Sequence, residues 1–360
     1  MSDLAELAAS AVERAVAAGA GDAEAYTSEA ENREVRVHGG EVESLTAATQ
    51  RGLGLRVWIG GRVGYGFGTD LSPSGIEAIA ARAVEAGRIA DEDEFAAPPG
   101  GGEAPALAGL SDASRAEWSL AQIAGLTLVV ERIALESDAR IVAVEQTVYF
   151  DSAERVAIAS STAPGGEYET TSCYAYLQAL AEGEKGRETG LGFGLARGPA
   201  GIEPLTIGRE GAERATEMIG SSKPASRTCP VVLDPTVAAS FVGLLGAAAG
   251  ADAVQRGRSP LAERLGEEVA AEAFVLSDDG LDPEGFATAP VDAEGAPRRR
   301  TALIEAGRLR TYLYDSYTAR RGDALTTGNA GRSGYRSPPG VSASNLIVSP
   351  GTASLEQLLR

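Results

Sequence analysis

Histidine and cysteine are scarce in this sequence. Its 360 residues include one histidine, His38, and two cysteines, Cys173 and Cys229. One histidine cannot supply a two-histidine metal site, and His38 flanks the turn in "VHGGE", where we expect an exposed residue without a catalytic role. The cysteines are far apart and lack Cys-x-x-Cys spacing, so we expect neither a disulfide framework nor a cysteine zinc site. A reducing cytoplasm is the expected compartment.

Basic charge and long apolar runs are also lacking. With 32 Lys plus Arg against 51 Asp plus Glu, the formal net charge is -19. Such a surface repels phosphate backbones and anionic lipids, so nucleic acid is not expected as a direct ligand. The basic cluster Arg298-Arg299-Arg300 is interpreted as a solvated strand edge. No apolar run approaches the ~20 residues that span a bilayer, so no membrane association is expected.

The length and the apolar content of 44% predict two or three domains with cores of their own. The stretch "DEDEFAAPPGGGEAP" combines a charge run with proline and glycine and lacks apolar periodicity, which is typical of a linker. We therefore expect an N-terminal domain at 1–90, a linker or exposed loop at 91–112, a central domain at 113–220 and a C-terminal domain at 229–360.

The N-terminal segment alternates helix and hairpin signals. Apolar spacing predicts a helix at 3–18, and Gly-Gly pairs inside "VHGGE" and "IGGRV" predict tight turns between antiparallel strands. Ser72-Pro73 then supplies an N-cap and a proline at the first helical position, which predicts a second helix.

The rest of the chain continues this mixture. We expect helices at 115–136, 202–219 and 236–254; two strands within 141–162; and further strands near 168–183, 188–198, 229–234, 271–277, 286–292, 301–306 and 308–315. Helices segregated from antiparallel hairpins indicate an α+β fold.

Two glycine-rich stretches, "GYGFG" at 64–68 and "GLGFGLARG" at 190–198, do not fit a phosphate-binding loop. Such a loop leads directly into a helix N-terminus. Here the glycines alternate with apolar residues in a strand pattern, which predicts close packing of another backbone against the strand.

Polar groups gather in two C-terminal stretches. Six carboxylates within seventeen positions could perform acid–base work or hold a hard cation, or could simply form turns and solvated loops; they are Asp278, Asp279, Asp282, Glu284, Asp292 and Glu294. The loop "TTGNAGR" at 326–332 suits binding of a peptide backbone or carboxylate, although an ordinary turn would also explain it.

The order of motifs in the last third of the chain resembles the TldD/PmbA family. The motifs are "VVLDP", an alanine-rich helix, "RGRSPLAERLGE", "LSDDG", "VDAEG", "LIEAGRLRTYLYDSYTAR", "TTGNAGR" and "SNLIVSPG", together with "GLGLRVWIGGRVGYGFGTDLS" upstream. Members of that family continue well beyond the last of these motifs, so the resemblance implies that the closing part of the C-terminal domain is missing here.

The resemblance implies a metalloprotease assembly, historically named a modulator of DNA gyrase, that acts on unfolded or flexible peptides. A TldD-type subunit carries His-Glu-x-x-x-His and zinc, and it pairs with a PmbA-type subunit, also called TldE. Aligned with that motif, Gly243, Leu244 and Ala248 replace the two histidines and the glutamate, and none of them can bind zinc or remove a proton from water. This chain therefore resembles the PmbA/TldE-type subunit, with no cofactor of its own. We expect Phe241, Leu244 and Leu245 to pack a regular helix there.

In this interpretation the chain forms part of a substrate cleft, as the partner of a TldD-type subunit in a heterodimer or through self-association as a homodimer. The residues expected to line the cleft are Asp292, Glu294, Thr327, Gly328, Asn329 and Arg332. Two alternatives stay open: a stand-alone hydrolase that uses the carboxylates of 278–294, and a homodimeric peptide-binding module without catalysis.

Overall fold

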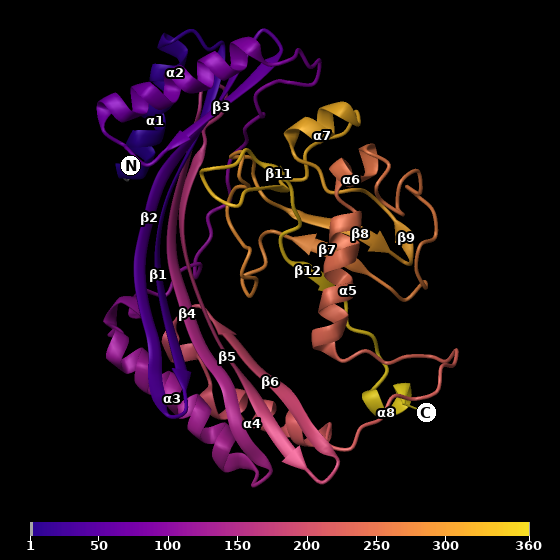
Figure 1. The fold of residues 1–360 in the computed structure, drawn as a ribbon. Coiled ribbons are helices and arrows are strands. Elements are labelled where there is room, and N and C mark those ends of the chain that lie inside the picture. Colours follow the sequence, from indigo (N-terminus) through magenta and orange to yellow (C-terminus); the bar gives the residue numbers. More distant parts are fainter. Residues whose placement is uncertain (1–2, 360) are drawn as a thin grey trace.

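A long, curved, six-stranded sheet forms the frame of the molecule, and the C-terminal part of the chain lies on its hollow side (Figure 1). The structure is a computed structural model and describes residues 3–359. The strands are β1 (Asp22–His38), β2 (Glu41–Ile59), β3 (Arg62–Gly68), β4 (Ile141–Ser160), β5 (Gly166–Gly183) and β6 (Gly186–Ala196). Their order is β3-β2-β1-β4-β5-β6, with antiparallel neighbours throughout. The pairing of β1 with β4 joins the segments 1–90 and 113–220 in one sheet.

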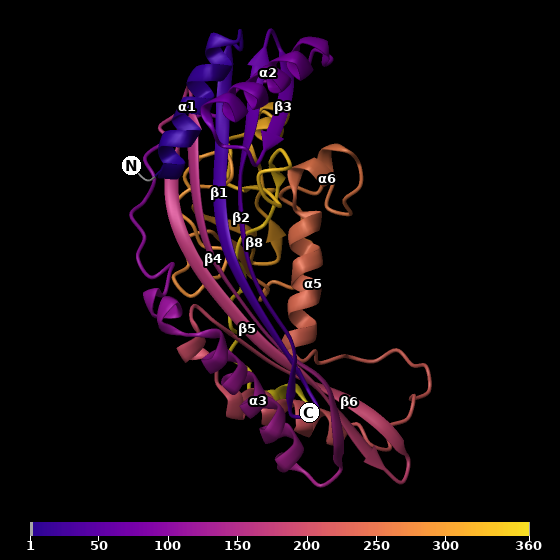
Figure 2. The ribbon, with the colours of Figure 1, turned by 60° about the vertical axis from the view of Figure 1, so that its left-hand side comes forward.

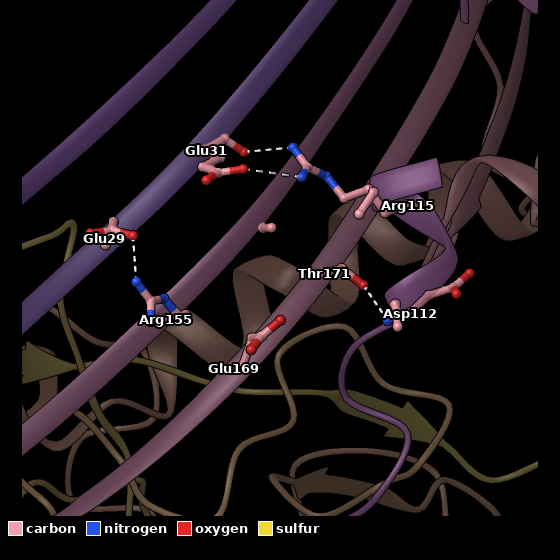
Figure 3. A pocket seen from close by; sticks show the side chains of 10 residues that line it. Glu29, Glu31, Asp112, Arg115, Arg155, Glu169 and Thr171 are labelled. Atoms are coloured by element: carbon pink, nitrogen blue, oxygen red, sulfur yellow. Dashed lines mark hydrogen bonds and ion pairs between the residues drawn. The ribbon is translucent and has the colours of Figure 1, made fainter. Parts of the chain in front are cut away.

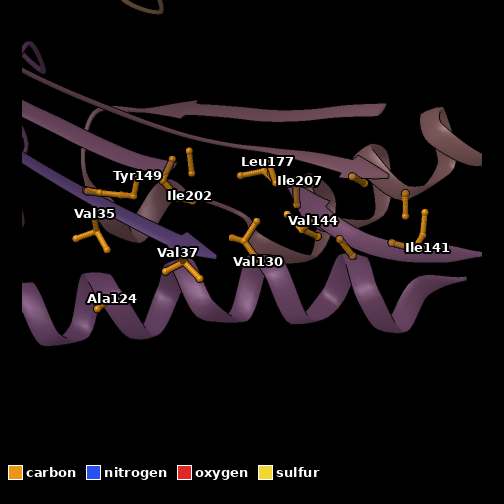
Figure 4. Packing of buried hydrophobic residues seen from close by; sticks show 14 of the residues in the cluster. Val35, Val37, Ala124, Val130, Ile141, Val144, Tyr149, Leu177, Ile202 and Ile207 are labelled. Carbon is orange, nitrogen blue, oxygen red and sulfur yellow. The ribbon is translucent and has the colours of Figure 1, made fainter. Parts of the chain in front are cut away.

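Four helices cover the opposite face of this sheet, two at each end (Figure 2). They are α1 (Asp3–Ala17), α2 (Pro73–Ile89), α3 (Leu120–Ser137) and α4 (Pro204–Glu217), with the short 3-10 turns η1 (Ala113–Glu117) and η2 (Pro199–Gly201). Figure 4 shows the core under α3 and α4, where alternate strand residues such as Val35, Val37 and Leu177 meet Val130 and Ile207. Because strand side chains alternate between faces, the residues between them point to the hollow side.

The local signals at the start of the chain are confirmed. Both Gly-Gly pairs form the predicted turns, and the Ser72 hydroxyl accepts the backbone N–H of Gly75 at 3.2 Å, as expected for the N-cap of α2. The glycine-rich strands pack closely against helices, since a Cβ on Gly64 would lie 2.0 Å from the Ala83 carbonyl oxygen. A Cβ on Gly192 would lie 1.9 Å from that of Ile207.

The β1–β2 turn is also held from outside the hairpin. The buried Glu131 carboxylate of α3 accepts the backbone N–H groups of Gly39 and Gly40, each at 2.9 Å. Replacing Glu131 with alanine should lower the free energy of unfolding by about 2 kcal/mol, because hydrogen bonds to a charged acceptor are lost. Urea unfolding measures the effect. The exposed Glu136→Ala on the same helix should leave stability nearly unchanged, and an equal loss in both variants would contradict the role given to Glu131.

The C-terminal part combines small sheets with short helices. Its elements are α5 (Pro235–Ala248), α6 (Ala251–Gln255), β7 (Leu276–Asp279), β8 (Arg300–Glu305), β9 (Arg308–Leu309), α7 (Ser316–Arg321), β10 (Ala330–Gly331), β11 (Gly340–Val341), β12 (Leu346–Val348) and α8 (Leu355–Leu358). One sheet has the order β12-β7-β8-β9 and the other pairs β10 with β11. Antiparallel sheets with helices on one side confirm the α+β prediction.

Several predicted strands are wrong. The two strands expected within 141–162 are the single strand β4, which continues through two register shifts near its start. No strand forms at 229–234, which is an extended lead into the Asp234 N-cap of α5. The segment 286–292 contributes one isolated bridge, between Val291 and Pro297, because it turns back on itself instead of extending.

The prediction that Phe241, Leu244 and Leu245 pack α5 against the protein is wrong for Phe241 and Leu244. Phe241 and Leu244 are 55% and 67% exposed, whereas Leu245 packs on the C-terminal core beside Val242. Gly246 sets this orientation, since a Cβ there would lie 2.4 Å from Leu346 Cδ1. Residues three and four apart share one helix face, so seating Gly246 turns Phe241 and Leu244 outward.

Membrane insertion finds no support in the described helices. Between residues 3 and 359, none of them has both the length and the apolar character needed to cross a bilayer.

Candidate functional site

Helix α5 offers no ligand atoms at the three positions aligned with the metal motif. Gly243 and Leu244 are exposed, and the Ala248 carbonyl accepts the Ser259 hydroxyl at 2.6 Å. Within residues 3–359, no group of three His, Cys, Asp or Glu side chains is arranged to hold a metal ion. The side chains of Gly243, Leu244 and Ala248 therefore contain no atom that could hold a zinc ion.

His38 is the last residue of β1 and lies at the β1–β2 turn. The side chain is exposed, and its Nδ1 donates to the Glu145 carbonyl oxygen at 3.1 Å. This contact holds the ring against β4.

The six residues expected to line a cleft come together from two neighbouring loops. The Asp292 carboxylate accepts the Ala330 N–H at 3.0 Å, and Arg332 Nε donates to the Ala293 carbonyl oxygen at 3.0 Å. The loops at 291–297 and 326–332 thus run side by side. Most of their polar side chains point into the protein, where they bind backbone groups.

The loop 326–332 is anchored by its own side chains. Thr327 Oγ1 accepts the Tyr314 N–H at 2.8 Å, and Asn329 Nδ2 donates to Asp278 at 2.7 Å. Gly328 has φ +73°, and a Cβ there would lie 2.5 Å from the Pro297 carbonyl oxygen. Thr327, Gly328 and Asn329 therefore shape the loop, and direct contact with a substrate stays a prediction for them.

Two arginines and two glutamates tie these loops to the sheet. Arg56 of β2 forms ion pairs with Glu24 of β1 at 2.7 Å and with Glu294 at 2.8 Å, and Arg332 pairs with Glu24 from the other side. Burial opposes the charged form of Arg56, but the two glutamates raise the pKa of its guanidinium above the ordinary value. Burial alone would raise the pKa of Glu294, whereas Arg56 and the Ser316 N–H lower it overall.

Asp292 has the opposite electrostatic setting. Burial and the neighbouring charge of Glu294 raise the pKa of its carboxyl group to about 7, although three backbone N–H groups favour the ionised form. The donors are Glu294, Ala296 and Ala330, at 2.9 to 3.0 Å. Adjacent acidic groups in this loop thus differ in protonation behaviour because only Glu294 has a guanidinium partner.

A cavity of about 760 Å³ opens where the hollow face of the sheet meets the C-terminal loops; we call it the interface cavity. The sheet contributes Tyr26 from β1, Glu154 from β4 and Tyr168 from β5, and the loops contribute Arg298 and Arg332. The sequence carried no signal for the three sheet residues, which come together only through the order of the strands. The interpretation of 298–300 as a solvated edge is wrong for Arg298, which is half-buried while Arg299 and Arg300 are exposed.

A smaller pocket of about 310 Å³ lies on the helix-covered face, near η1 (Figure 3). Its two arginines are already paired: Arg155 with Glu29 at 2.6 Å, and Arg115 with Glu31 at 3.7 Å. Arg115 also binds the buried Asp151 at 2.8 Å. These pairs account for the cationic groups of the pocket, which therefore give no indication of a ligand.

Comparison with known families matches three consecutive segments of the chain. They correspond to the PmbA/TldA metallopeptidase domain 1 over residues 23–87, the central domain over 114–219 and the C-terminal domain over 226–360.

Curated relatives include a metalloprotease from Methanocaldococcus jannaschii, 34% identical over 54% of this chain and 43% of its own length. A second, from Methanothermobacter thermautotrophicus, is 32% identical over 59% of this chain and 47% of its own length. The matched part of the chain thus spans about half the length of these two proteins. Metalloprotease PmbA from Escherichia coli O157:H7 is 27% identical over 81% of this chain and 65% of its own length.

Solved structures share the fold over nearly the whole chain. A candidate modulator of a DNA gyrase from Thermotoga maritima superposes with a TM-score of 0.88 at 24% identity, covering 98% of this chain and 79% of that one. TldE from Thermococcus kodakarensis superposes with a TM-score of 0.82 at 19% identity, covering 97% of this chain and 78% of that one. With three family domains matched in order and the fold reproduced, this chain belongs to the PmbA/TldD family of metallopeptidases.

Proposed function

We propose that this chain is the PmbA/TldE-type subunit of a cytoplasmic TldD/PmbA-type metalloprotease that degrades or processes unfolded or flexible peptides. In this role it binds no metal, serves as scaffold and contributes walls to the substrate cleft. Zinc belongs to a TldD-type partner, with a heterodimer as the expected assembly and a homodimer as the other possible one. The relatives named PmbA and TldE support this assignment.

The observation that carries the proposal is the chemistry of α5. The helix keeps its place in a family-like fold, yet positions 243, 244 and 248 hold glycine, leucine and alanine. A zinc peptidase needs imidazole or carboxylate ligands and a group that removes a proton from the attacking water. A neighbouring subunit that carries those groups would complete the site.

The test combines metal binding with activity. The purified chain should bind less than one zinc per ten molecules after dialysis against micromolar zinc, as measured by elemental analysis. It should not cleave a flexible peptide such as unfolded casein fragments until a TldD-type partner from the same source is added. A chelator should then abolish cleavage.

Cleavage by the chain alone that survives the chelator would overturn the proposal. Loss of such activity in Asp292→Asn or Glu294→Gln would identify a carboxylate-dependent hydrolase instead. Saturable peptide binding without turnover, even with the partner present, would identify a binding module.

A further inference from the structure

The interface cavity contains polar groups that the described protein leaves without partners. Arg298 Nη1 is buried and has no hydrogen-bond acceptor among residues 3–359, while Arg298 Nε makes one long bond, 3.3 Å, to the Val291 carbonyl oxygen. The Glu154 carboxylate forms neither a hydrogen bond nor an ion pair with any described residue. The hydroxyl groups of Tyr26 and Tyr168 likewise find no described partner. Buried polar groups normally have a partner, and Arg298 Nη1 lacks one within the described chain. The side chains of Glu154, Tyr26 and Tyr168 line the same cavity, where they can meet a ligand.

The charges of the cavity are separated instead of neutralised. Arg298 and Glu154 do not pair with each other in the described structure, although both line the same space. Burial raises the pKa of the Glu154 carboxyl group. Burial is also the largest cause of the raised pKa of both tyrosines, and the Glu154 charge raises it further. Arg298 acts on Tyr168 in the opposite direction. The charges of Glu154 and Arg298 thus both act on the Tyr168 hydroxyl, in opposite directions.

The second arginine of the cavity is already engaged. Arg332 pairs with Glu24, donates to the Tyr65 hydroxyl at 3.2 Å and stacks on the Tyr26 ring at 5.0 Å. Its charge is balanced within the protein. Arg298 is therefore the cation left to meet an anionic group of a ligand.

The remaining wall suits a chain of backbone amides. The loop 331–343 contributes mainly small residues, including Gly334, Ser337, Gly340 and Ser342, which leave room beside their peptide groups. A volume of about 760 Å³ lies within the range of roughly 300–1,000 Å³ that is typical of ligand sites. The space is large enough for a few amino-acid residues, and polar residues of the sheet and of the loops line it together with small apolar ones.

We propose that the interface cavity binds a short peptide with free ends, whose ammonium group contacts Glu154 and the tyrosine hydroxyls and whose carboxylate contacts Arg298. A guanidinium binds a carboxylate through paired N–H donors, and a carboxylate accepts the three N–H bonds of an ammonium group. The inference rests on the proposed function, since a peptidase assembly generates such fragments. The residues that line the cavity include none from α5, so we assign the cavity to fragments and not to the cleavage step.

Binding to the chain alone tests this inference separately from the peptidase assay, because neither zinc nor a partner is needed. Trialanine, N-acetyl-trialanine, trialanine amide and free alanine are titrated by calorimetry. Trialanine should bind at least tenfold more tightly than either blocked peptide, and free alanine should bind weakly because it has no peptide group to contact the loop 331–343. Absence of trialanine binding at millimolar concentration, or equal binding of the blocked forms, would overturn the inference.

Variants assign each end of the peptide. Glu154→Gln should weaken trialanine binding tenfold, and N-acetylation of the peptide should then have little further effect on its affinity. Arg298→Met should also weaken trialanine binding tenfold, and amidation should then have little further effect. The control is Glu169→Gln, an exposed carboxylate on the other face of β5, which should bind trialanine like the wild type. Thermal melts confirm folding. If the blocked peptides lose affinity equally in all variants, the assigned contacts are wrong.

Discussion

Replacing Arg56 with methionine should lower the free energy of unfolding by about 3–5 kcal/mol, because it leaves buried carboxylates without their cation. Glu24 and Glu294 are 0% and 2% exposed, and both bind Arg56 within 2.8 Å. Glu24 keeps Arg332, but Glu294 keeps only the Ser316 N–H among the partners that residues 3–359 provide. Methionine preserves the apolar part of the side chain, so the loss of stability measures the effect of removing the positive charge. Urea or thermal unfolding measures it.

The control for this prediction is a pair on the surface. Arg187 and Glu182 lie at the open end of the sheet with side chains 63% and 46% exposed, so Arg187→Met should change stability by no more than about 0.5 kcal/mol. A double-variant cycle adds a stricter test. Glu294→Gln should cost much less in Arg56→Met than in the wild type, because the unpaired charge is then removed. Additive effects would show that Arg56 and Glu294 are not coupled.

The same ion pairs explain how the candidate site is assembled. Arg56 and Glu294 are 238 positions apart, and Arg332 meets Glu24 across 308 positions. The loops at 291–297 and 326–332 are thus positioned by the sheet of the first half of the chain. Loss of Arg56 should therefore weaken peptide binding in the interface cavity as well as stability, since Arg332 belongs both to the ion-pair network and to the cavity wall.

The sequence predicted the turns and helix starts correctly, because these depend on the chemistry of neighbouring residues. Gly39 and Gly40 have φ of 62° and 79°, which glycine adopts readily, so the Gly-Gly turns could be recognised in advance. Ser72-Pro73 acts through its nearest neighbours. The boundary inside 141–162 was predicted wrongly because charged residues in β4 resemble a turn. In fact they lie on a long strand between β1 and β5.

The candidate site depends on contacts that no short pattern encodes. Asp292 and Glu294 stood out as carboxylates, but their burial and their different partners follow from the docking of the loop on the sheet. Tyr26, Glu154 and Tyr168 belong to three strands whose order is set by pairing along their whole length. Arg298 was predicted to be exposed because it begins a run of three arginines. Of the three, Arg298 lines the cavity, whereas Arg299 and Arg300 are exposed. Such residues could be found only from the assembled structure.

The pH dependence of stability should reveal the buried Asp292. Its pKa of about 7 in the folded protein exceeds its ordinary value of 3.8, so between these values the folded state holds a proton that the unfolded chain has released. The resulting stabilisation is complete below pH 3.8 and is lost as the pH rises through 7. Each pKa unit corresponds to about 1.4 kcal/mol, so the full loss approaches roughly 4 kcal/mol.

Asp292→Asn isolates this effect from other titrating groups, because asparagine keeps an oxygen acceptor but cannot titrate. From pH 4.5 to pH 7, the wild type should lose about 3 kcal/mol of unfolding free energy relative to the variant. In the control Asp70→Asn, the Ser72 hydrogen bonds lower the pKa of the native carboxylate, so that difference should be constant above pH 5. Glu294, whose pKa is also lowered, loses its contribution only as the pH falls below its ordinary value of 4.5. A flat difference for Asp292→Asn would mean that its three backbone N–H donors outweigh burial and the charge of Glu294, and that both carboxylates of the loop are ionised at neutral pH.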